Sequence, residues 1–89
     1  MKKYRILKKN IKEKTEDCFR GYYKNHEIHI DKYREYDLVD HKETNLGWYI
    51  IVTCPDGCIC YDGWWSEGRD ANIDEAIEEA LAGSLLIEK

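Results

Sequence analysis

The chain has 89 residues, of which 43% are hydrophobic and 12% aromatic, with a single proline. This length predicts one domain, 1–89, and the composition is that of a packed globule. A domain this small excludes a second lobe and disfavours a deep, water-free catalytic cavity. No apolar run reaches the ~20 residues of a membrane span, and the first residues lack the apolar core of a signal peptide. We therefore expect a cytoplasmic protein of the host-cell cytosol, with its four cysteines reduced.

The net charge of −4 combines two regions of opposite sign. Residues 1–24 hold nine basic side chains against three acidic ones, a net charge of +6. Residues 25–89 hold five against fifteen, a net charge of −10. The basic N-terminal segment, 1–14, is interpreted either as a solvated arm or as a contact for nucleic acid. The acidic remainder either serves solubility or attracts basic protein surfaces.

The first half of the chain predicts strands, with one ambiguous region. Residues 11–23 fit a helical stripe, or their second part pairs as a hairpin with the strand that follows. Gly21 costs a helix about 1 kcal/mol, which slightly favours the hairpin. The alternation in 27–33 predicts a strand that extends toward residue 39, and 40–45 read as a polar loop.

The clearest element is a second hairpin, in which Pro55, Asp56 and Gly57 separate two strands rich in β-branched and aromatic residues. A three-residue loop predicts a register in which Trp48 faces Trp64. Trp64 then shares the core side with Trp48, while Trp65 points to the opposite side. Both sides of this hairpin are apolar. One side can be covered by a helix, and the other needs a second layer or a partner.

A helix is predicted to follow from Ile73, because Asn72 and Glu75 imitate a capping box. Gly83 is a natural end for it. One side is apolar or small, and it consists of Ile73, Ala76, Ile77, Ala80, Leu81 and Ser84. The opposite side is acidic, and it consists of Asp74, Glu75, Glu78 and Glu79. The expected fold is therefore α+β, a small antiparallel β-sheet of three to five strands packed by a C-terminal acidic amphipathic helix.

The spacing of the cysteines raises the question of a metal. Cys54, Cys58 and Cys60 lie on one hairpin, with Cys18 and three histidines elsewhere, and thiolates and imidazoles bind zinc. Because no second cysteine pair exists, reduced core thiols are favoured over structural zinc, and no metal or cofactor is expected. A Cys54–Cys58 bridge is conceivable, but a reducing cytosol would open it. The pattern places no histidine beside a thiol, so we expect no catalytic residue and no enzyme.

Three segments, 47–52, 55–58 and 72–80, resemble the HicB-like antitoxin pattern of two strands followed by a helix. In overall character, the short, acidic and aromatic chain is also similar to small phage-encoded inhibitors of the anti-CRISPR type. Both resemblances imply a basic nucleic-acid-binding protein as the partner, either a CRISPR effector or an RNase toxin.

We therefore expect a non-catalytic inhibitor, phage or mobile-element encoded, that occludes a basic nucleic-acid-binding site with an acidic, aromatic surface. The acids should set the association rate and Trp65 the dissociation rate. Two alternatives stay open: a HicB-like antitoxin that neutralises a small RNase toxin, and a small nucleic-acid-binding protein that uses residues 1–14. A homodimer is compatible with the apolar second face, and no membrane partner is expected. The candidate partner-binding residues are Asp62, Trp64, Trp65, Glu67, Asp70, Asp74, Glu75, Glu78 and Glu79.

Overall fold

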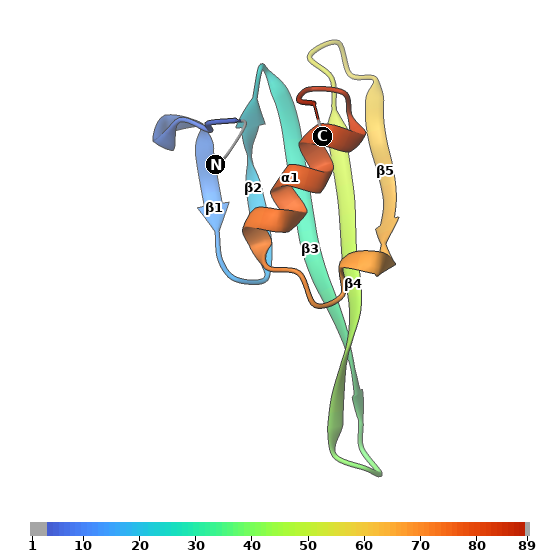
Figure 1. Ribbon diagram of the computed structural model, residues 1–89. Helices are drawn as coiled ribbons and strands as arrows, with labels where there is room; N and C mark the ends of the chain where they lie inside the picture. Colours follow the sequence, from blue (N-terminus) through green and yellow to red (C-terminus); the bar gives the residue numbers. More distant parts are fainter. Residues whose placement is uncertain (1–3, 89) are drawn as a thin grey trace.

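The computed structural model describes residues 4–88 and shows one five-stranded antiparallel sheet and a C-terminal helix (Figure 1). The strands lie in chain order, because each connection between them is short enough to return the chain to a neighbouring position. This arrangement confirms the α+β class. The elements are η1 (Lys8–Asn10), β1 (Ile11–Lys14), β2 (Cys18–Tyr23), β3 (His26–Asp37), β4 (Lys42–Thr53), β5 (Ile59–Trp65), η2 (Ser66–Gly68) and α1 (Ile73–Gly83).

The core lies between α1 and one face of the sheet (Figure 1). We call this face the helix side and the opposite face the open face. Side chains alternate between the two along each strand. Six residues of β2, β3 and β4 form one buried cluster with five residues of α1: Phe19, Ile28, Ile30, Trp48, Ile50, Val52, Ile73, Ala76, Ile77, Ala80 and Leu81. Within residues 4–88, no helix is long and apolar enough to cross a membrane.

The capping box that the sequence predicts begins α1. The Asn72 side chain accepts a hydrogen bond from the Glu75 backbone N–H (2.9 Å), and the Glu75 carboxylate accepts one from the Asn72 backbone N–H (3.2 Å). The helix ends at Gly83, as expected. The helix is followed by Leu85, Leu86 and Ile87, which form no strand and do not continue the helix.

Residues 11–23 form strands β1 and β2, so the hairpin interpretation is confirmed and the helical one is wrong. Crowding explains why position 21 is a glycine, because a Cβ there would lie 2.6 Å from the carbonyl oxygen of Asn10. The basic segment is held against the domain over its described part. β1 is the edge strand, and Lys14 Nζ donates to Asp74 Oδ1 (2.8 Å). Lys2 and Lys3 lie outside the described residues.

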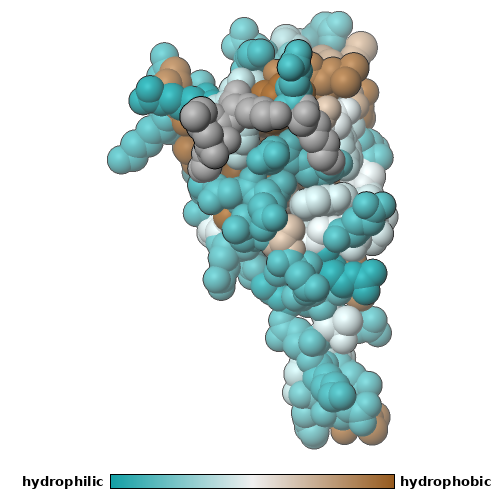
Figure 2. Space-filling model, viewed as in Figure 1, coloured by the Kyte–Doolittle hydropathy of each residue, from teal (hydrophilic) through white to brown (hydrophobic). Residues whose placement is uncertain are grey.

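Strands β3 and β4 extend beyond the rest of the sheet as a two-stranded ribbon, which gives the molecule its longest dimension of 45 Å (Figure 1). We call residues 34–46 the projecting hairpin. The polar loop expected at 40–45 is wrong, because β4 begins at Lys42 and the turn covers 38–41. Leu38 and Val39 are 77% and 86% exposed in this turn. Figure 2 shows the resulting hydrophobic patch at the far end of the hairpin.

The register of β4 against β5 differs by one residue from the expected one. Trp48 pairs with Trp65, and Tyr49 pairs with Trp64. A bulge between Val52 and Thr53 places one extra residue on the β5 strand, and a shift of one residue exchanges the faces of a strand. The prediction that Trp64 lies in the core is therefore wrong. Trp64 lies on the open face and is 54% exposed, and the half-buried Trp65 packs against the core on the helix side.

Candidate functional site

Three aromatic rings meet on the open face, and we call Tyr33, Tyr49 and Trp64 the ring cluster. The Trp64 ring lies edge to face with Tyr33 (4.9 Å between centroids, 69° between planes) and with Tyr49 (5.2 Å, 85°). β3, β4 and β5 supply one ring each, so the sheet itself sets their spacing. Tyr33 is 45% exposed. Because large rings in solvent are unusual and contribute strongly to interfaces, this cluster is the strongest docking feature of the open face.

Asp62 lies beside the ring cluster, on the same face of β5. Its carboxylate accepts a hydrogen bond from the Tyr49 hydroxyl. That bond favours the neutral phenol and raises the pKa of Tyr49. Asp62 is exposed, so it adds negative charge at the edge of an aromatic surface. The structure thus brings together two of the predicted residues, Asp62 and Trp64.

Two arginines near this surface are engaged with carboxylates. Arg20 forms a bidentate pair with Asp31 (2.8 and 2.9 Å). Arg34 donates to Asp17 and to Glu43, and its hydrogen bonds hold the pKa of Asp17 below its usual range. The charges of both guanidinium groups are therefore neutralised by carboxylates of the same chain.

A second group of predicted residues lies on the helix side. Trp65, Glu75, Glu78 and Glu79 line a shallow pocket of about 170 Å³. The Trp65 ring packs closely on Gly68, where a Cβ would overlap the ring.

Two of these glutamates also have structural partners. Glu75 holds the helix cap, and Glu79 accepts a hydrogen bond from the Tyr61 hydroxyl (2.9 Å). Burial, together with that bond, raises the pKa of Tyr61 to about 12. Glu78 is exposed, which leaves it the best placed of these acids to meet a partner.

The remaining predicted acids lie between or beside these two groups. Glu67 is in η2 and Asp70 follows it, and both are exposed where the chain passes from β5 to α1. Asp74 pairs with Lys14 of the edge strand. The nine predicted residues therefore belong to two sides of the domain: Asp62 and Trp64 lie on the open face, and Trp65 lies with the helix acids on the other.

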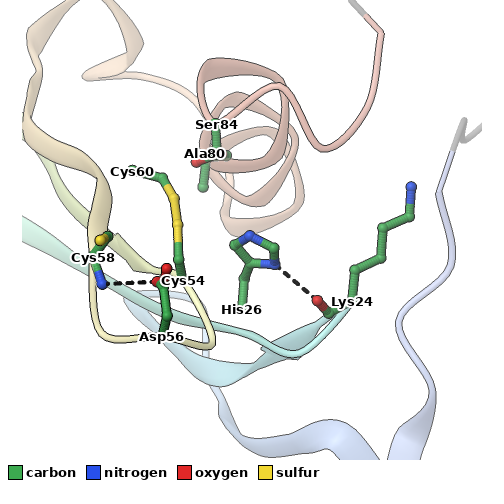
Figure 3. Close-up of a disulfide and its surroundings, with 8 residues drawn as sticks. All are labelled: Lys24, His26, Cys54, Asp56, Cys58, Cys60, Ala80 and Ser84. Atoms are coloured by element: carbon green, nitrogen blue, oxygen red, sulfur yellow. Dashed lines mark hydrogen bonds between the residues drawn. A yellow bond between two sulfur atoms is a disulfide. The ribbon is translucent and has the colours of Figure 1, made fainter.

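Cys54 and Cys60 form a disulfide (Cα–Cα 6.3 Å), so the expectation of reduced thiols is wrong for this pair (Figure 3). The bulge in β5 turns Cys60 to the helix side, where Cys54 also lies, whereas Cys58 is exposed and unpaired. His26 has a ring nitrogen within 4.8 Å of both bonded sulfurs, a neighbour that the sequence pattern does not predict.

Sequence reasoning missed two sets of residues. Tyr33 and Tyr49 were not candidates, because the wrong register put Tyr49 on the side opposite Trp64. The sequence pattern extends a strand toward Leu38 and Val39 and does not predict that they are exposed in a turn. The sequence does contain an indication that these two residues have a function, because two apolar residues between Asp37 and Asp40 are unusual in a turn.

Comparison of the chain with protein-family models, with curated proteins and with solved structures finds no significant match.

Proposed function

We propose that this protein is a non-catalytic inhibitor, encoded by a phage or mobile element, that acts in the cytoplasm of the host cell. It binds a basic nucleic-acid-binding surface, such as that of a CRISPR effector, and excludes the nucleic acid. The observation that carries the proposal is the exposed ring cluster beside Asp62 on a sheet face that α1 does not cover.

The rings and the acids have different tasks in this binding. Trp64 and Tyr33 are about half exposed, so a partner can remove substantial aromatic area from water. An arginine or lysine of the partner can also stack on the Trp64 ring. The acids attract the basic surface and speed association, whereas the rings slow dissociation. The apolar side of α1 packs on the sheet, and its acidic side extends the negative field.

The projecting hairpin supplies a shape that fits a groove. Its tip is preorganised, because the Asp37 carboxylate accepts hydrogen bonds from the backbone N–H groups of Val39 (2.8 Å) and Asp40 (3.2 Å). A rigid tip loses little entropy on binding. Exposed Leu38 and Val39 flanked by acids suit a cleft that is apolar inside and basic at its rim.

A second candidate is a HicB-like antitoxin, because β4, β5 and α1 follow one another in the order that the resemblance implies. Its partner would be a small RNase toxin, which is also basic. Direct nucleic-acid binding through residues 1–14 is less well supported, since Lys14 is paired with Asp74.

The test is a plaquing assay in a panel of bacterial strains, each carrying one CRISPR effector directed against the infecting phage. Expression of the chain should restore plaquing in at least one strain. The double variant Tyr33→Ala/Trp64→Ala should lose that protection, and Asp62→Asn should weaken it. Leu85→Ala is the matched control, because Leu85 is 90% exposed and lies outside the proposed surface.

Full protection by the Tyr33→Ala/Trp64→Ala protein, in a form that is folded by circular dichroism, would contradict the proposal. Rescue of growth from a co-expressed small RNase toxin, without protection in any strain, would favour the antitoxin instead. A salt-dependent shift with DNA or RNA alone would favour the nucleic-acid binder. A dimer on size-exclusion chromatography that Trp64→Ala dissolves would assign the open face to a second copy of the chain.

A further inference from the structure

We propose that His26, Cys54 and Cys60 form a zinc-binding site in the reduced protein, and that the disulfide is the oxidised, metal-free state of the same site. His26 begins β3, Cys54 directly follows the last residue of β4, and Cys60 lies in β5, so the three residues meet on the helix side at one end of the sheet. This inference does not depend on the proposed function.

The ligand atoms are already close enough for a common ion. One nitrogen of His26 and the two sulfurs all lie within 4.8 Å of one another. In a tetrahedral site with Zn–S near 2.3 Å and Zn–N near 2.0 Å, the ligand atoms are roughly 3.5 Å apart. Reduction releases the two sulfurs from each other, and small rotations of the side chains then bring all three atoms to these separations.

The hydrogen bonding of His26 favours metal binding. Its Nδ1 lies 2.8 Å from the carbonyl oxygen of Lys24, an acceptor, so Nδ1 carries the proton and donates it (Figure 3). The lone pair is therefore on Nε2. Metal-ligating histidines almost always hold their second nitrogen in this way, which fixes both the tautomer and the orientation of the ring. Lys24 and Asn25, both with positive φ, form the tight turn before β3 from which this carbonyl comes.

The surroundings favour a cation. The last turn of α1 lies beside the site, with Ala80 and Ser84 next to the sulfur pair and the imidazole (Figure 3). The C-terminal end of a helix carries partial negative charge on its terminal carbonyl groups. His26, Cys54 and Cys60 are half-buried, so the site is partly screened from solvent but still open to it, and solvent can supply a water as the fourth ligand.

The oxidised, metal-free state and the reduced, zinc-bound state differ by two electrons and one Zn²⁺ ion. A dithiol reductant gives two electrons and two protons to the disulfide, which becomes two thiols, and the reductant becomes a cyclic disulfide. Zn²⁺ then displaces the two thiol protons and binds two thiolates and the neutral imidazole. In the reverse direction a small-molecule disulfide takes the two electrons from the thiolates and two protons from solvent and becomes two thiols, while Cys54 and Cys60 form the disulfide and Zn²⁺ is released.

The test uses Cys18→Ser/Cys58→Ser protein, in which only the two proposed cysteine ligands remain. After reduction with a phosphine and removal of oxygen, it should bind one Zn²⁺ per chain in a titration against a chromophoric chelator. Co²⁺ should give a thiolate-to-metal charge-transfer band and the intense visible bands of a tetrahedral site. The oxidised form of the same protein should bind neither ion.

Ligand variants in this background separate the proposal from a purely structural disulfide. His26→Gln should weaken Zn²⁺ binding by at least about tenfold and shift the Co²⁺ spectrum, and Cys54→Ser should abolish the charge-transfer band. His29→Gln is the control and should change neither. The proposal is overturned if the reduced, folded Cys18→Ser/Cys58→Ser protein binds no Zn²⁺, or if His26→Gln binds it as tightly as the parent.

Discussion

Replacing the fully buried Trp48 by phenylalanine should destabilise the protein far more than the same change at Trp64. Trp48 is 0% exposed, and its indole N–H donates to the carbonyl oxygen of Gly68 at 2.9 Å. The Gly68 carbonyl also accepts a hydrogen bond from the Ala71 backbone N–H (2.9 Å), so Trp48→Phe removes one of its two donors. The loss of one intramolecular hydrogen bond costs about 0.5–1.5 kcal/mol. The smaller ring also leaves a cavity worth about 1 kcal/mol.

The expected loss is therefore about 1.5–2.5 kcal/mol, a large part of the ~5 kcal/mol that a small domain often has. Trp64→Phe keeps an aromatic ring against Tyr33 and Tyr49 in a side chain that is already half in solvent. It should change stability by less than about 0.5 kcal/mol.

Urea unfolding followed by far-ultraviolet circular dichroism, with the disulfide intact, measures both values from the midpoints at constant slope. The reasoning is refuted if Trp64→Phe costs as much as Trp48→Phe. That result would mean that Trp64, and not Trp65, packs beside Trp48 in the core, as a register without the bulge requires.

Three further changes test other parts of the structure. Burial raises the pKa values of Tyr4 and Tyr61 to about 12, whereas an unfolded tyrosine has a pKa near 10. The contribution of these two side chains to stability is therefore complete below pH 10 and is lost as the pH rises through 12. Urea midpoints should fall over this window, and Tyr61→Phe should flatten the fall; a midpoint independent of pH would contradict this. Asn72→Ala removes the capping box and should cost about 1 kcal/mol in the same assay, whereas no loss would argue against the cap. Gly83→Ala should lower the melting temperature, because the new Cβ overlaps the Tyr61 ring. The overlap costs about 1–3 kcal/mol, which exceeds the gain in helix propensity. A higher melting temperature would refute that packing.

The candidate site could be predicted only in part from the sequence. The acids of α1 were found because a helical period of 3.6 residues separates its two sides. Asp62 and Trp64 were found because rings among acids are conspicuous, but the surface they belong to was not. Tyr33 and Tyr49 join Trp64 only through the pairing of three strands, and no local pattern in the chain records that pairing.

Local interactions were decided by the sequence itself. The α+β class, the capping box at Asn72 and the end of α1 at Gly83 depend on neighbours within a few residues, where propensity and hydrogen-bonding groups act directly. Strand register, in contrast, depends on contacts between distant residues, and a single bulge near Cys60 moved every later side chain of β5 to the other face. Only the tertiary structure therefore decided that Trp64 is exposed, that Cys60 meets Cys54 and His26, and that β3 and β4 project beyond the sheet.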